Sequence, residues 1–234
     1  MLAIYKRELR AYFVTPIGYV CLAIFLAASG FLFSLTTLQS QTTDIGSYFT
    51  FSLFLLIIVC ALLTMRLFAE EKKMRTEQLL MTAPVSITSM VAAKFFAAET
   101  VFGAALLLSA FNVVPLYIYA EPYTAQIVGN YVAFFLVGSS FIAIGIFMSS
   151  LTENQLAAAV ATIGALLFLL IMNFANSFID LYVFRYVIDW LSIYARYQNF
   201  TQGIFDYNAL LYYASICFVF LFLTVRVYEK RRWA

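Results

Sequence analysis

The chain has 234 residues, of which 64% are hydrophobic and only 11% are charged, and its mean hydropathy is +0.92. A water-soluble domain does not carry so large an apolar fraction, so the composition excludes that class and predicts a membrane protein. The formal net charge is +2. Because the lysines and arginines stand next to long apolar stretches, they leave no basic surface for nucleic acid, which is not an expected partner.

Six stretches of the chain are long and apolar enough to cross a membrane as helices, which takes about 20 residues each. They cover residues 17–38, 48–65, 89–119, 128–151, 155–178 and 209–225. Each stretch is continuously apolar and lacks the alternation of a membrane β-barrel strand. We therefore expect an all-α membrane protein in which residues 16–234 form one domain of six transmembrane helices.

The first 15 residues repeat apolar side chains at helical spacing, whereas Lys6, Arg7 and Arg10 lie largely elsewhere around the axis. This pattern is typical of a helix that lies in the membrane interface, and Pro16 separates it from the first span. We expect an interfacial elbow helix over residues 1–15 that is retained and not cleaved as a signal peptide. A cytosolic extension whose cations only orient the chain is the alternative.

Lysines and arginines concentrate at the N-terminus, in the second connection and at the C-terminus, and only Arg185 and Arg196 fall outside these regions. With six spans the three regions lie on one side of the membrane, which the positive-inside rule identifies as the cytoplasm. The sequence thus predicts a multi-pass protein of a bacterial cell membrane with both termini in the cytoplasm.

The chain shows no catalytic constellation. It contains no histidine, which excludes histidine-based metal sites and general bases, and none of its nine glycines is followed by lysine, which excludes a P-loop. Cys21, Cys60 and Cys217 lack metal-ligand spacing and are expected to pack as small apolar residues. We expect a non-enzymatic chain without cofactor or metal, whose energy source would lie in another polypeptide.

Two polar features stand within or between the predicted spans. Glu99 is either a functional intramembrane carboxylate or, as we favour, a structural one near the headgroups that pairs with a neighbouring cation. Thr152 and Gln155 have the spacing of a capping box, which predicts a tight turn over residues 151–154 and a helix that begins directly after it.

The external connection, residues 179–208, is unusually aromatic. Aromatic rings favour the headgroup level, so we expect short or re-entrant helices in the outer interface. The rings either gate a substrate path or form a belt that closes the outer end of the bundle. The candidates for an outer gate are Tyr182, Tyr186, Trp190, Tyr194, Tyr197 and Phe200.

Residues 66–89 form a charged, helix-prone loop between the second and third predicted spans. Thr76 is placed to cap a short helix that Pro84 would end. Between them, Leu79, Leu80 and Met81 form an apolar knob surrounded by charges, which suits a contact in the groove of a partner. A solvated loop that only joins two spans is the alternative.

The sequence RTEQLLMTAPVS over residues 75–86, followed by Lys94, resembles the cytoplasmic loop of type 2 (ABC-2 type) ABC exporter permeases. The stretches SSLTENQ over residues 149–155 and EKRRW over residues 229–233 are similar to the gliding-motility-associated branch of that family. Arg75 and Gln78 depart from the pattern, because many members have glycine at the first position and glutamate at the second.

The resemblance implies a permease subunit of an ABC transporter, most simply an exporter, with residues 66–89 as its cytoplasmic coupling loop. It implies docking on a separate pair of P-loop ATPase subunits, which would bind ATP and Mg, and a dimer with a second copy or a related permease. An auxiliary membrane subunit is compatible with it. The residues assigned to ATPase coupling are Glu70, Glu71, Arg75, Thr76, Glu77, Leu79, Leu80, Met81 and Pro84.

Alternatives from other classes are an ATPase-independent membrane scaffold and a secondary transporter. Leu80→Asp is expected to disrupt ATPase docking while leaving membrane insertion intact, because it places a charge in an apolar contact. The sequence does not identify the substrate.

Overall fold

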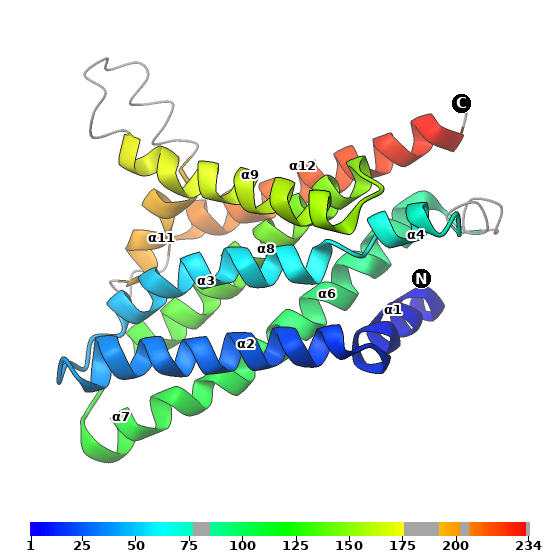
Figure 1. Ribbon diagram of the computed structural model, residues 1–234. Coiled ribbons are helices and arrows are strands. Elements are labelled where there is room, and N and C mark those ends of the chain that lie inside the picture. The colour runs from blue at the N-terminus through cyan, green and yellow to red at the C-terminus, as the bar shows by residue number, and fades with distance from the viewer. Residues whose placement is uncertain (77–84, 176–191, 202–205, 233–234) are drawn as a thin grey trace, which may run out of the picture.

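The computed structural model describes residues 1–76, 85–175, 192–201 and 206–232. Six of its helices are long and apolar enough to cross a membrane, so the prediction of an all-α, multi-pass membrane protein is confirmed (Figure 1). The six spans run Pro16–Leu38, Gly46–Lys73, Ile87–Tyr119, Thr124–Leu151, Gln155–Met172 and Tyr207–Arg231.

The helical elements follow one another closely along the chain. They are α1 (Leu2–Val14), α2 (Pro16–Phe33), η1 (Ser34–Leu38), α3 (Gly46–Thr64), α4 (Ala69–Lys73), α6 (Ile87–Ser109), η2 (Ala110–Val113), α7 (Val114–Tyr119), α8 (Thr124–Leu151), α9 (Gln155–Ala175), α11 (Ile193–Thr201) and α12 (Tyr207–Arg232). Figure 1 places α1, α4 and both termini at one end of the bundle and α11 at the other.

A sharp elbow joins α1 to α2. Pro16 at the start of α2 disfavours a helical conformation at Thr15, which is extended with φ −89° and ψ 151°. Gly18 lets the two helices approach closely, since a Cβ there would lie 2.5 Å from the carbonyl oxygen of Tyr12. The structure thus has a helix where the sequence predicts the elbow helix, and its place in the membrane interface stays a prediction.

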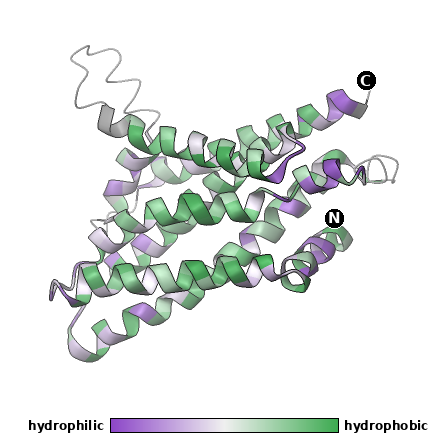
Figure 2. Ribbon diagram, viewed as in Figure 1, coloured by the Kyte–Doolittle hydropathy of each residue, from purple (hydrophilic) through white to green (hydrophobic). Residues whose placement is uncertain are grey.

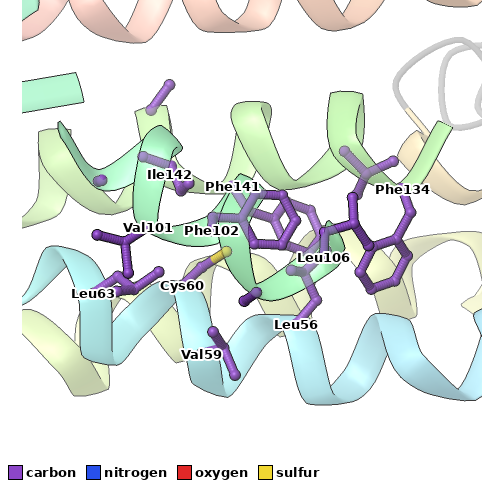
Figure 3. Packing of buried hydrophobic residues seen from close by; sticks show 14 of the residues in the cluster. Leu56, Val59, Cys60, Leu63, Val101, Phe102, Leu106, Phe134, Phe141 and Ile142 are labelled. Carbon is purple, nitrogen blue, oxygen red and sulfur yellow. The ribbon is translucent and has the colours of Figure 1, made fainter. Parts of the chain in front are cut away.

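Helices α3 and α8 form the centre of the bundle and are the most buried of the spans. Two glycines on α8 make their close packing feasible: a Cβ at Gly145 would overlap Thr64 of α3, and one at Gly138 would overlap the ring of Phe102 of α6. Figure 3 shows the apolar core that results, in which Phe102 and Cys60 lie among aliphatic and aromatic side chains. Cys21 and Cys60 are buried, as small packing residues would be.

Figure 2 shows apolar residues along the middle of the helices and polar residues concentrated at their ends. The tight turn between α8 and α9 is confirmed, because α8 ends at Leu151 and α9 begins at Gln155. The capping-box prediction is wrong. The side chain of Asn154 accepts a hydrogen bond from the N–H of Leu156 at 2.9 Å, whereas the Thr152 hydroxyl donates to the Asn154 carbonyl at 3.4 Å. Asparagine directly before the helix is as good a cap as threonine.

Candidate functional site

The short helix α4 begins the predicted coupling loop and ends in a Schellman motif. The N–H of Thr76 donates to the carbonyl of Glu71 and the N–H of Arg75 to that of Lys72, both at 3.0 Å. Arg75 takes the left-handed position of this motif with φ 56°. Glycine is the usual residue there, because a side chain in this conformation costs free energy. The loop therefore leaves α4 by a defined turn.

Ser149 fixes the start of α4 to the end of α8. Its hydroxyl oxygen accepts hydrogen bonds from the backbone N–H groups of Phe68 and Ala69, each at 3.2 Å, and its hydroxyl donates to the Met65 carbonyl at 3.1 Å. These are backbone groups that the start of a helix leaves without an intrahelical partner. One buried serine therefore ties α4, the end of α3 and α8 together.

Lys72 and Phe68 connect α4 to the α8–α9 turn and to α12. The buried ammonium group of Lys72 donates to the carbonyl of Ser150, and it lies 5.9 Å from the centre of the Tyr228 ring. The rings of Phe68 and Tyr228 pack with their centres 4.8 Å apart. The motif at residues 149–155 thus has a structural role that sequence reasoning did not assign: it receives α4.

A buried charge network, consisting of Arg7, Glu8, Glu71 and Lys94, joins α4 to α1 and α6. Lys94 is 0% exposed, and its ammonium nitrogen lies 3.1 Å from Glu8 and 2.9 Å from Glu71. It also donates to the carbonyl of Leu67 at 2.7 Å. Arg7 lies 2.6 Å from each of the two carboxylates. Two cations and two anions thus meet where three helices converge.

The charge network shifts the protonation equilibria of its members on α1. Burial by itself would raise the pKa of Glu8, but Lys94 and Arg7 outweigh this effect and hold the pKa below its ordinary value. Burial would lower the pKa of Arg7, and the carboxylates of Glu8 and Glu71 raise it instead. Both side chains are therefore ionised at neutral pH, as the ion pairs require.

Arg66 forms a second link between the loop and the elbow. Its guanidinium lies 3.3 Å from Glu70, donates to the hydroxyl of Thr15 at 2.6 Å and stands 5.7 Å from the centre of the Tyr12 ring. The Tyr12 hydroxyl donates to the carbonyl of Leu63 at 2.7 Å. A cavity of about 410 Å³ between α1 and α4 is lined by the charges of both links.

The structure therefore gathers Glu70, Glu71, Arg75 and Thr76 of the predicted coupling set at the end of the bundle that holds both termini. The remaining members of the set, Glu77, Leu79, Leu80, Met81 and Pro84, lie outside the described residues. Sequence reasoning missed the contribution of Arg7, Glu8 and Ser149. The signal available for them was the clustering of opposite charges in α1 and the loop.

Three of the outer-gate candidates, Tyr194, Tyr197 and Phe200, lie on α11, whereas Tyr182, Tyr186 and Trp190 lie outside the described residues. Tyr197 and Phe200 are fully buried, and the Tyr197 hydroxyl donates to the side-chain oxygen of Asn130 at 3.4 Å. Helix α11 therefore packs onto α8. These two rings are positioned to close the bundle, which favours the alternative of a closing belt.

Glu99 on α6 differs from the interpretation favoured by the sequence. It is 9% exposed and accepts a hydrogen bond from the Ser139 hydroxyl of α8 at 2.5 Å, and no cation pairs with it among the described residues. Lys94, the nearest cation along the chain, points instead into the charge network. The expected ion pair is thus wrong, because that lysine already has two carboxylate partners.

Neither a family model nor a curated protein matches this chain. Within the described ranges, histidine, cysteine, aspartate and glutamate side chains form no group of three that could hold a metal ion. The function must therefore be argued from the geometry of α4 and its surroundings.

Proposed function

We propose that this chain is the membrane-spanning permease subunit of an ABC transporter, and that it works as an exporter driven by a separate ATPase. The observation that carries the proposal is the anchoring of α4. This helix of five residues is held by α1 and α6 through the charge network and by the end of α8 through Ser149. A loop that merely joined two spans would not need so many buried polar contacts.

The contacts of α4 suit the transmission of force. A partner that pushes on residues 77–84 pushes on a segment that follows directly from the Schellman turn of α4. Charge-assisted hydrogen bonds are the strong ones in proteins, and here they are buried, so α4 moves together with α1 and α6. Rigid-body rocking of packed helices is an established way for such a displacement to cross a membrane.

The partner in this proposal is a pair of P-loop ATPase subunits that bind ATP and Mg, and the apolar knob formed by Leu79, Leu80 and Met81 is their docking surface. A second copy of the chain, or a related permease, completes the translocation pathway. The membrane is a bacterial cell membrane, and the end of the bundle with α1, α4 and both termini faces the cytoplasm, as the distribution of lysine and arginine favours.

The experiment that tests the proposal is co-purification with the P-loop ATPase encoded beside this chain. Leu80→Asp is expected to abolish co-purification, whereas the same substitution at exposed Leu38, at the opposite end of the bundle, leaves it unchanged. Both variants should insert into membranes at the wild-type level. Unchanged co-purification of Leu80→Asp would overturn the docking assignment, and one chain per complex by particle mass would overturn the dimer.

A secondary transporter is the second candidate, and Glu99 is the observation that favours it. One carboxylate oxygen of Glu99 accepts from Ser139, while the other has no hydrogen-bond partner within the described part of the chain. Ionisable groups within spans commonly mark ion pathways. Substrate movement by the chain alone in ATPase-free vesicles, lost in Glu99→Gln, would favour this candidate over the ABC permease.

A further inference from the structure

A cavity of about 750 Å³ opens on the side of the bundle between α9 and α12. Helix α8 contributes Ile144 to its lining, α9 contributes Leu169, and α11 contributes Arg196. Figure 1 shows α9, α11 and α12 as neighbours at the end of the bundle remote from both termini. None of these residues belongs to the α4 site, so the cavity is a separate feature.

The cavity is polar at one end and apolar along the rest. Along α12 its lining begins with Asn208 and Tyr212, which share the α11 end with Arg196, and continues to Val219 and Phe220. Asn208 and Phe220 are twelve residues apart, which corresponds to roughly 18 Å along a helix. That length exceeds half of the hydrocarbon core, which is about 30 Å thick. The cavity therefore extends from the membrane surface past the middle of the bilayer.

Arg196 supplies the positive charge at the polar end. Its guanidinium carbon lies 4.3 Å from the centre of the Tyr212 ring, an arrangement that orients the guanidinium plane. Arginine has five N–H donors, so it can bind a phosphate while it keeps the other contacts that it makes. A fixed guanidinium at the headgroup level above an apolar channel is complementary to an anionic amphiphile.

We infer that this cavity binds one anionic phospholipid from the leaflet on the α11 side, with its phosphate at Arg196 and an acyl chain along Val219 and Phe220. The outer faces beside the opening are apolar, as the exposed Leu211 and Phe218 show, so the occupant enters sideways from the bilayer. A helix of a second copy would place apolar side chains against the guanidinium, whereas a phosphate matches it in charge. The site requires no ATPase and extends beyond the role proposed above.

The test measures phospholipids retained by the purified full-length chain from vesicles with equal phosphatidylglycerol and phosphatidylcholine, by native mass spectrometry. Wild type should retain at least about tenfold more phosphatidylglycerol, as expected for a charge-assisted contact. Arg196→Gln should bring the ratio close to one. Arg226→Gln, which removes an exposed cation near the opposite end of α12, should leave the ratio unchanged.

A second variant tests the apolar part of the cavity independently of Arg196. Val219→Trp fills the space for the acyl chain, so it should lower the retention of both lipids about equally. An equal wild-type retention of the two lipids would overturn the inference, as would a ratio that survives Arg196→Gln or retention that survives Val219→Trp. Because no ATPase is present, none of these outcomes bears on the docking experiment with Leu80→Asp.

Discussion

Lys94→Met should strongly destabilise the protein, because it removes one charge from a buried network that is neutral in sum. The ammonium group lies 2.9 Å from Glu71 and 3.1 Å from Glu8. At an effective dielectric constant of about 20, each contact corresponds to roughly 5 kcal/mol of Coulomb attraction before desolvation is subtracted. Removing one partner of a buried pair costs about 3–5 kcal/mol, because the other partner stays buried with its charge. Arg7 remains to compensate for one carboxylate only.

The assay for this prediction is thermal unfolding of the purified chain in detergent. A loss of about 3–5 kcal/mol corresponds to a fall in Tm of roughly 6–20 °C for a chain of this size. Lys73→Met, at an exposed position on α4, should leave the Tm nearly unchanged. Adding Glu8→Gln to Lys94→Met should recover part of the loss, since it removes the uncompensated anion. Equal Tm values for Lys94→Met and Lys73→Met would refute the electrostatic account of α4 anchoring.

Three further predictions concern backbone geometry and pH. Arg75→Gly should raise the free energy of unfolding by about 0.5–1 kcal/mol, seen as a higher Tm, because φ 56° suits glycine. Gly145→Val should lower the Tm by driving α8 from Thr64, at a cost of about 1–3 kcal/mol, whereas Gly164→Ala, with open space around its Cβ, should not lower it. The lowered pKa of Glu8 stabilises the fold above its ordinary value of 4.5, and this contribution is lost as pH falls through the lowered pKa. The Tm difference between wild type and Glu8→Gln should therefore shrink as the pH falls below about 4.5.

The six spans were predictable because lipid imposes a simple requirement of length and apolar content. The ends of the helices were less predictable. The second apolar run stops near Met65 in hydropathy, yet the second span continues to Lys73, because Ser149 and the charge network stabilise polar residues beyond the apolar run. Such stabilisation comes from residues distant in sequence, which hydropathy cannot register.

The candidate site shows the same limit more clearly. The loop sequence indicated an exposed docking helix, and the resemblance supplied its role, but neither indicated that Glu71 turns inward to Lys94. Lys94 was noticed only as a cation beyond the loop, and Glu8 only as part of an amphipathic segment. Ion pairs between residues 86 positions apart depend on helix packing, so they follow from the fold and not from spacing.

The position of Glu71 gives the predicted coupling set two layers with different tasks. Glu71 is paired within the chain, so its substitution should act through the stability of α4, as that of Lys94 does. Arg75 and Thr76 are exposed at the end of α4, where a partner can reach them. If an ATPase docks on the segment that follows, its push reaches α1 and α6 only while Glu71 and Lys94 stay paired. Glu71→Gln should therefore weaken coupling of ATP hydrolysis to transport more than it weakens co-purification, whereas Leu80→Asp should reduce both together.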